Sequence, residues 1–174
     1  ARMIELVDNL IRLSRLDSKK VPVKIETFNY RKVIEEIVEF FQFEATSKGL
    51  FLEIEPSKNQ REVILTDRTH FEAILTNLIK NALKYTQNGG VSISWTQDKN
   101  NLLVTVSDTG IGIKKEDQPI IFDRFTQVNQ MSKGGFGIGL SLTQIYVNLL
   151  GGRIWCESSF GQGSRFNFTI PLQS

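Results

Sequence analysis

Helical and strand-like hydrophobic patterns alternate along this chain, and this alternation limits the possible folds more than any other feature. Apolar residues recur at three- and four-residue spacings over residues 30–48, 67–85 and 136–150. Alternating or short apolar runs, typical of strands, cover residues 24–28, 50–55, 61–65, 91–96, 102–107, 153–157 and 164–170. The pattern predicts an α+β fold, a two-layer α/β sandwich with about three helices on a mixed sheet of five or more strands.

Two pairs of these strands are expected to form hairpins from their local pattern. Residues 50–55 and 61–65 alternate like the two arms of one hairpin, and residues 91–96 and 102–107 flank a polar turn at Asp98–Asn101. Thr66 or Asp67 is expected to cap the helix that ends near Tyr85.

The chain opens with a segment that stands apart from this domain. Residues 2–17 carry a wide apolar helical stripe, which on an end helix indicates a partner. Pro22 disfavours helix at Val21 and marks a boundary. We therefore expect an isolated amphipathic helix in residues 1–20 and one domain in residues 21–174. Because the first residues already have a mid-helix pattern, we expect the chain to be a piece of a longer protein.

Composition excludes several classes of protein. Of the 174 residues, 40% are hydrophobic and 23% are charged, which is ordinary for a globular domain. The chain has 21 basic and 19 acidic residues, so no bulk attraction to nucleic acid or to an anionic membrane is expected. A single cysteine, Cys156, excludes a disulfide scaffold and fits a reducing compartment such as the cytoplasm.

Polar side chains form a stripe on the helix predicted over residues 67–85. Asn77 and Asn81 stand four residues apart, so they share a face, and Lys84 and Tyr85 extend it. Asparagine is a poor helix former, so two of them within two turns indicate a use beyond helix stability. A solvated helix face remains the alternative explanation of this stripe alone.

Glycine-rich segments follow at two places. Asp108-Thr109-Gly110-Ile111-Gly112-Ile113 ends a strand with an acid and two alternating glycines, and Gly134–Leu140 opens a helix. Backbone N–H groups at such a helix start attract phosphate. The second segment lacks the Gly-Lys-Ser/Thr ending of a P-loop and the βαβ setting of a dinucleotide fold. Taken alone, the first segment is also compatible with a simple turn.

In this order, the motifs resemble the ATP-binding catalytic domain of sensor histidine kinases, in the superfamily shared with gyrase, Hsp90 and MutL. Residues 77–86 match its N-box, residues 108–112 its first glycine box, residues 121–125 its F-box, residues 135–140 its second glycine box and residues 161–164 a further one. The resemblance implies the Bergerat ATP-binding fold for residues 21–174. It makes residues 1–20 similar to the second helix of the dimerisation and phosphoacceptor hairpin.

The resemblance also implies an adenine pocket. Asp108 is expected to accept a hydrogen bond from the exocyclic amine of adenine, so ATP should bind better than GTP. Gly110 and Gly112 are expected to let the base lie close, and Tyr85 and Ile113 to pack on the ring.

The phosphates and the metal are expected at the other end of that pocket. Asn81 is the implied Mg²⁺ ligand, and Lys84 is within the expected reach of phosphate. Residues 124–134 resemble the mobile ATP lid of the family, and Arg124 and Lys133 within it are candidate phosphate contacts. The second glycine box supplies the remaining implied ATP-binding residues: Gly135, Phe136, Gly137, Ile138, Gly139 and Leu140.

Asn77 is the residue that discriminates among the reactions of the superfamily. It is counted among the ATP-binding residues and, with Asn81, Lys84 and Arg124, among the expected catalytic residues. A glutamate that activates water stands at this position in the ATPase branches, whereas an amide takes no proton at neutral pH. We therefore expect slow hydrolysis and transfer of phosphate to a histidine on a dimerisation helix outside this chain. His70, the only histidine, lacks the sequence context of an acceptor.

The implied partners are ATP, the dimerisation helices of a homodimeric parent kinase and the receiver domain of a response regulator. Three alternatives stay open at this point. They are a non-catalytic nucleotide-binding regulatory module of the same fold, an ATP-hydrolysing clamp of the gyrase or Hsp90 kind, and a serine kinase that acts on anti-sigma partners. The intact motifs disfavour the first, Asn77 the second and the opening helix the third.

Overall fold

The computed structural model of the chain describes Val7, Leu10, Ile11 and Ser14 and residues 21–55, 62–126 and 137–172. Its elements in chain order are β1 (Ile25–Asn29), α2 (Tyr30–Ser47), β2 (Phe51–Ile54), β3 (Val63–Asp67), α3 (Arg68–Tyr85), β4 (Gly90–Gln97), β5 (Asn101–Asp108), a 3₁₀ helix (Gln118–Ile120), α4 (Gly139–Leu149), β6 (Ile154–Ser158) and β7 (Ser164–Pro171).

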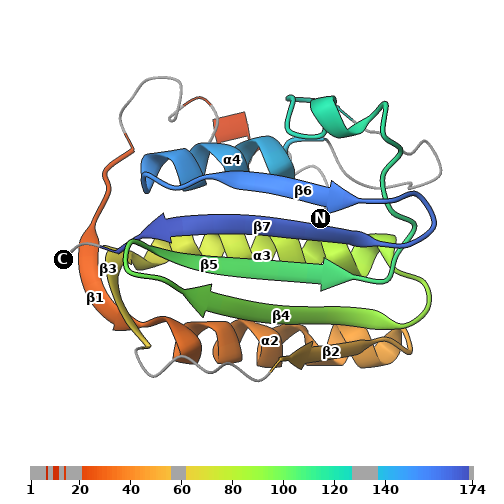
Figure 1. Cartoon of the computed structure of the whole chain (residues 1–174), viewed down its shortest axis with the longest axis horizontal. Coiled ribbons are helices and arrows are strands. Elements are labelled where there is room, and N and C mark those ends of the chain that lie inside the picture. The colour runs from red at the N-terminus through yellow and green to blue at the C-terminus, as the bar shows by residue number, and fades with distance from the viewer. Residues whose placement is uncertain are drawn as a thin grey trace.

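A five-stranded mixed sheet carries one layer of helices, which confirms the predicted α+β sandwich. The strand order is β2-β4-β5-β7-β6, in which β2 runs parallel to β4 and the other pairs are antiparallel. In Figure 1 the helices lie behind this sheet, and α3 crosses its middle. Strands β1 and β3 form a separate two-stranded antiparallel sheet.

One of the two predicted hairpins is correct and the other is wrong. Strands β4 and β5 pair around the Asp98 turn as expected, with Trp95 opposite Val104. By contrast, β2 pairs with β4 and β3 pairs with β1, so the two described strands β2 and β3 do not form the predicted hairpin. The reason is that strand alternation reports which face is buried and carries no information about which strand lies beside it.

Local signals set the helix ends. Asp67 caps α3, as predicted, by accepting a hydrogen bond from the His70 N–H at 2.9 Å. Gly49 follows α2 with φ of +68°, the left-handed conformation that ends a helix. Helix α4 begins at Gly139, later than the predicted residue 136, because Gly137 has φ of +67° and cannot continue a helix.

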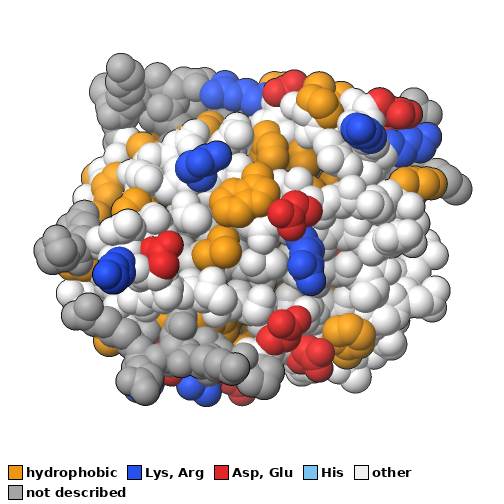
Figure 2. Space-filling model, in the orientation of Figure 1, with side chains coloured by type: hydrophobic (Ala, Val, Ile, Leu, Met, Phe, Trp, Pro, Cys, Tyr) orange, Lys and Arg blue, Asp and Glu red, His pale blue; other side chains and the backbone are white. Residues whose placement is uncertain are grey.

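The core lies between the helices and the sheet. Its largest fully buried side chains come from α2, α3, β4, β5, β7 and the turn before α4; they include Tyr30, Ile34, Phe71, Leu75, Leu78, Ile93, Leu102, Ile138 and Phe168. On the sheet face shown in Figure 2, acidic and basic side chains are interspersed. Among the described helices, none is long and apolar enough to span a membrane.

The predicted opening helix lies mostly outside the described residues. Within it, Val7, Leu10, Ile11 and Ser14 are helical, and Val7, Leu10 and Ile11 are exposed. These three apolar positions have the spacing of one helix face.

Candidate functional site

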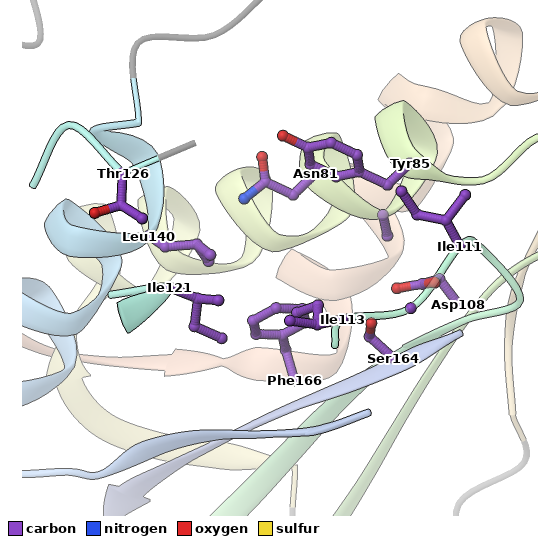
Figure 3. Close-up of a pocket in the computed structure, with 12 residues that line it drawn as sticks. Asn81, Tyr85, Asp108, Ile111, Ile113, Ile121, Thr126, Leu140, Ser164 and Phe166 are labelled. Atoms are coloured by element: carbon purple, nitrogen blue, oxygen red, sulfur yellow. The ribbon is translucent and has the colours of Figure 1, made fainter. Parts of the chain in front are cut away.

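A pocket lies where the C-terminal half of α3 faces the end of β5 and the start of β7. Figure 3 shows Asn81 and Tyr85 of α3 on one side and Asp108 and Ser164 on the other. Apolar side chains complete the wall. The lining residues are Asn81, Ala82, Tyr85, Asp108, Ile111, Gly112, Ile113, Ile121, Thr126, Leu140, Ser164 and Phe166. The two residues on which the predicted site most depends, Asn81 and Asp108, therefore share one cavity.

Helix α3 positions the amide of Asn81. Buried residues of α3, among them Ile74, Leu78 and Ala82, hold one side of the helix against the sheet, so the polar side must face elsewhere. Within the described part of the chain, no group hydrogen-bonds to the Asn81 side chain. No cluster of three His, Cys, Asp or Glu residues is found there either. A hard cation bound here would thus rely on an amide oxygen and on oxygens of its ligand.

Asp108 is the last residue of β5 and is held in place by backbone groups. Its Oδ1 accepts a hydrogen bond from the Gly110 N–H at 2.8 Å, and its backbone is paired with Ser164 of β7. Burial raises the pKa of this carboxyl above its ordinary value, against the opposing effect of hydrogen bonds from the Gly110 and Ser164 N–H groups. The carboxylate is half-buried and points into the pocket in Figure 3.

The chain itself requires the two glycines after Asp108. A Cβ on Gly110 would lie 2.4 Å from the Tyr85 carbonyl oxygen. Gly112 has φ of +67°, and a Cβ there would lie 2.1 Å from the Ser159 carbonyl oxygen. The family resemblance implies that both glycines let a base lie close. In the structure the loop also needs them to pass beside the end of α3 and the β6–β7 turn.

Polar contacts fix the loop that carries Ile113 on the pocket wall. The Ser158 Oγ accepts from the Ile113 N–H at 2.8 Å and lies 2.9 Å from the Ser164 Oγ. The Gln118 side chain donates to the Ile113 and Ser158 carbonyls at 3.1 and 2.9 Å. Ser158 of β6 thus holds the segment of residues 113–118 at both Ile113 and Gln118.

Asn77 and Lys84, the other two members of the predicted polar stripe, do not line the pocket. The Asn77 amide donates to the Gly139 carbonyl at 2.7 Å and to the Thr143 Oγ1 at 2.9 Å, so it faces α4. The Lys84 Nζ lies 4.9 Å from the centre of the Tyr85 ring, a cation–π contact. The stripe therefore divides between the pocket and α4.

The other predicted site residues lie in three settings. Arg124 is exposed and is not among the lining residues, and the Ile138 side chain is buried in the core. Gly137 and Gly139 lie at the start of α4, beside the lining residue Leu140. The positions of Lys133, Gly135 and Phe136 are outside the described residues.

Half of the lining residues were not singled out as site residues from the sequence. They are Ala82, Ile111, Ile121, Thr126, Ser164 and Phe166. Ala82, Ile111, Ile121 and Ser164 lie within the motifs that carry the family resemblance, so they would be found if every residue of those motifs were carried over. Phe166 has only a core-like pattern, which does not distinguish a pocket wall from the interior, and Thr126 directly follows the F-box.

Comparison with known proteins gives the same family throughout. The family model described as histidine kinase-, DNA gyrase B-, and HSP90-like ATPase matches residues 66–174. Over 99% of its length the chain is 34% identical to sensor histidine kinase WalK of Bacillus subtilis, of which it covers 29%. It is 32% identical to circadian input-output histidine kinase CikA of Synechococcus elongatus, again over 99% of the chain and over 24% of that relative. The chain thus spans less than a third of these curated relatives.

Solved structures agree with this result. Full-length ShkA in complex with AMPPNP has a TM-score of 0.91 and 25% identity, and the match covers 99% of this chain and 36% of that one. The catalytic domain of histidine kinase ThkA has a TM-score of 0.76 and 28% identity, covering 86% of this chain and 96% of that one. The chain therefore belongs to the histidine kinase-, DNA gyrase B- and HSP90-like ATPase family, in which it is an ATP-binding catalytic domain of the sensor histidine kinase type.

Proposed function

We propose that the domain of residues 21–174 binds Mg·ATP in this pocket and transfers the γ-phosphoryl group to a histidine on a dimerisation helix of the parent kinase. The observation that carries the proposal is the shared pocket of Asn81 and Asp108. One of these groups can recognise a purine and the other can bind a cation. The similarity to ShkA, solved with the ATP analogue AMPPNP, supports the choice of nucleotide.

Asp108 is proposed to recognise adenine. A carboxylate in this position accepts a hydrogen bond from the exocyclic amine, whereas guanine presents a carbonyl oxygen that repels it. Tyr85 and Ile113 both line the pocket and provide the apolar surfaces between which a ring can lie. The proposal therefore includes a preference for ATP over GTP.

Asn81 is proposed as the Mg²⁺ ligand. Its amide oxygen is a ligand type that Mg²⁺ accepts, and its free side chain in the described structure fits that role. When bound, the cation would neutralise charge on the phosphates. The start of α4 at Gly137 and Gly139 would supply backbone N–H groups to the phosphate chain, with Lys84, Arg124 and Lys133 as further cationic contacts.

Transfer to histidine, rather than to water, is proposed because the described pocket holds no second carboxylate to activate water. His70 is a poor acceptor because it is buried and its Nδ1 lies 2.9 Å from the Asp67 Oδ2. The acceptor would come from the dimerisation hairpin, to which residues 1–20 are proposed to contribute the second helix. A homodimeric, cytoplasmic parent kinase and a response regulator complete the proposal.

Two measurements on the 174-residue chain test this function. Calorimetry should detect Mg-dependent binding of ATP, and its absence would contradict the proposal. A separate dimerisation hairpin of the parent kinase, mixed with the chain and γ-labelled ATP, should then acquire an acid-labile phosphate. Binding without any transfer would favour a non-catalytic regulatory module, and rapid release of phosphate by the chain alone would favour an ATP-hydrolysing clamp.

A further inference from the structure

A closed polar triangle joins α3 to α4. The Asn77 Nδ2 donates to the Gly139 carbonyl at 2.7 Å and to the Thr143 Oγ1 at 2.9 Å, and the Thr143 Oγ1 in turn donates to the same Gly139 carbonyl at 2.9 Å. Thr143 is fully buried. Both N–H groups of the Asn77 amide are thereby used within the protein.

The triangle requires a donor at position 77. A backbone carbonyl only accepts hydrogen bonds, so the group that faces the Gly139 oxygen must carry N–H or O–H. A carboxylate of the same size would set one acceptor against another and leave that contact repulsive. The amide of Asn77 is therefore specified by α4, independently of any contact with a ligand.

The triangle lies next to the proposed phosphate end of the pocket. Asn81 follows Asn77 by one turn on the same face of α3, and Leu140 follows Gly139 directly; both Asn81 and Leu140 line the pocket. No side chain caps the start of α4 in the described structure. Asn77 and Thr143 therefore tie the first turn of α4 to α3, one helical turn from the Asn81 amide.

We propose that Asn77 and Thr143 are positioning residues, which hold the start of α4 at a fixed distance from Asn81 and so align the metal ligand with the backbone that receives the phosphates. The inference rests on the proposed function. It assigns Asn77 an action through α4 in place of direct contact with metal or phosphate, and it adds Thr143 to the residues on which phosphate binding depends.

The substitution Asn77→Asp separates the two roles. A residue that ligates Mg²⁺ directly should keep or gain affinity when its amide becomes a carboxylate, because Mg²⁺ prefers carboxylate oxygen. A positioning donor should lose affinity, because both N–H groups disappear. We expect Mg·ATP binding about tenfold weaker by calorimetry, which corresponds to the loss of a typical hydrogen bond. Unchanged or tighter binding would overturn the proposal.

Variants at Thr143 test the second half of the triangle. Thr143→Val, which keeps the shape and removes the hydroxyl, should weaken Mg·ATP binding several-fold, roughly threefold to tenfold, whereas Thr143→Ser should bind like the wild type. Binding of adenosine, which has no phosphate, should stay unchanged in every variant. A parallel loss of adenosine affinity, or no effect of Thr143→Val, would contradict the proposal.

A double-mutant cycle completes the test. Because Asn77 and Thr143 act in one unit, the loss caused by Asn77→Ala combined with Thr143→Val should be smaller than the product of the two single losses. Independent effects that multiply in full would show that Asn77 acts elsewhere. Wild-type chain that binds no Mg·ATP would instead refute the proposed function itself, so the two failures are distinguishable.

Discussion

Asp108 meets two opposing demands at the scale of a single residue. A charged carboxylate is needed to accept from adenine, yet burial raises its pKa and so disfavours the charge. Asp108→Asn should therefore weaken ATP binding by about 2 kcal/mol, or roughly 30-fold. Calorimetry measures this loss. Glu157→Gln is the control, because it removes one negative charge at an exposed position of β6. Equal affinities of the Asp108 variant and the wild type would contradict the assigned role.

The same substitution should stabilise the chain in the absence of nucleotide. A carboxyl whose folded pKa is raised favours folding in its protonated form, so its contribution is present at low pH and is lost as the pH rises through that pKa. At neutral pH the buried charge is a net cost, which the neutral amide of the Asp108→Asn variant removes. We expect a melting temperature about 2 °C higher. A lower melting temperature at pH 7 would show that the charge itself is stabilising.

Gly112 is the glycine that the pocket can least replace. Gly112→Ala combines a positive φ with a Cβ 2.1 Å from the Ser159 carbonyl oxygen, so we expect a loss of about 3 kcal/mol in the free energy of unfolding and weaker nucleotide binding. Gly161→Ala is the matched control, since its φ is +83° with no atom within 4 Å. It should lose only about 1 kcal/mol, the backbone part, in denaturant unfolding. Equal losses would contradict the steric explanation.

At the scale of the element, Asp67 connects the start of α3 to two neighbours. Its carboxylate caps His70 N–H, accepts from Lys24 N–H at 2.6 Å and lies 2.9 Å from the His70 Nδ1. Asp67→Ala should lower the free energy of unfolding by about 3 kcal/mol, because buried donors are left without an acceptor. Asn29→Ala removes the more exposed cap of α2 and should cost about 1 kcal/mol. Chemical denaturation of both variants measures the difference, and equal losses would contradict the role given to burial.

The pH dependence of this cap has the opposite sign to that of Asp108. Burial alone would raise the pKa of Asp67, but hydrogen bonds from the His70 and Lys24 N–H groups and the His70 side chain outweigh it and lower the pKa. Its stabilising effect is therefore present above the ordinary carboxyl range and is lost as the pH falls through the lowered folded value. Thermal unfolding of the wild type and Asp67→Ala should converge in acid; a constant difference would contradict this.

Sequence predicted those elements whose signals are local. The β4–β5 hairpin, the Asp67 cap and the ends of α2 and α3 all depend on residues within a few positions of one another. The true partner of β2 and the contact of Asn77 with α4 depend on residues far apart in the chain, as in the pairing of Phe51 with Gly90. Alternation and helical spacing indicate which side of a strand or helix is apolar. They do not indicate which distant element packs against that side.

At the scale of the whole molecule, the pocket is assembled from segments that the chain order separates. Asn81 comes from α3, Asp108 from β5, Leu140 from α4 and Ser164 from β7, and the antiparallel pairing of β5 with β7 brings two of them together. The sequence could place Asn81 and Asp108 in one site only through the resemblance of the ordered motifs. No local pattern predicts that the first residue of β7 lies beside the last residue of β5.

A pocket built from four elements should stabilise the whole domain when it is filled. At a concentration of about 100 times Kd, Mg·ATP should add about 2.7 kcal/mol to the free energy of unfolding, which raises the melting temperature by roughly 5–10 °C. Removal of Mg²⁺ with EDTA should reduce this shift for the wild type but not for Asn81→Ala, because that variant lacks the proposed ligand. Asn88→Ala, an exposed asparagine outside the pocket, is the control and should keep the dependence on Mg²⁺. An equal shift with GTP would contradict recognition by Asp108, and an unchanged shift in EDTA would contradict the metal role of Asn81.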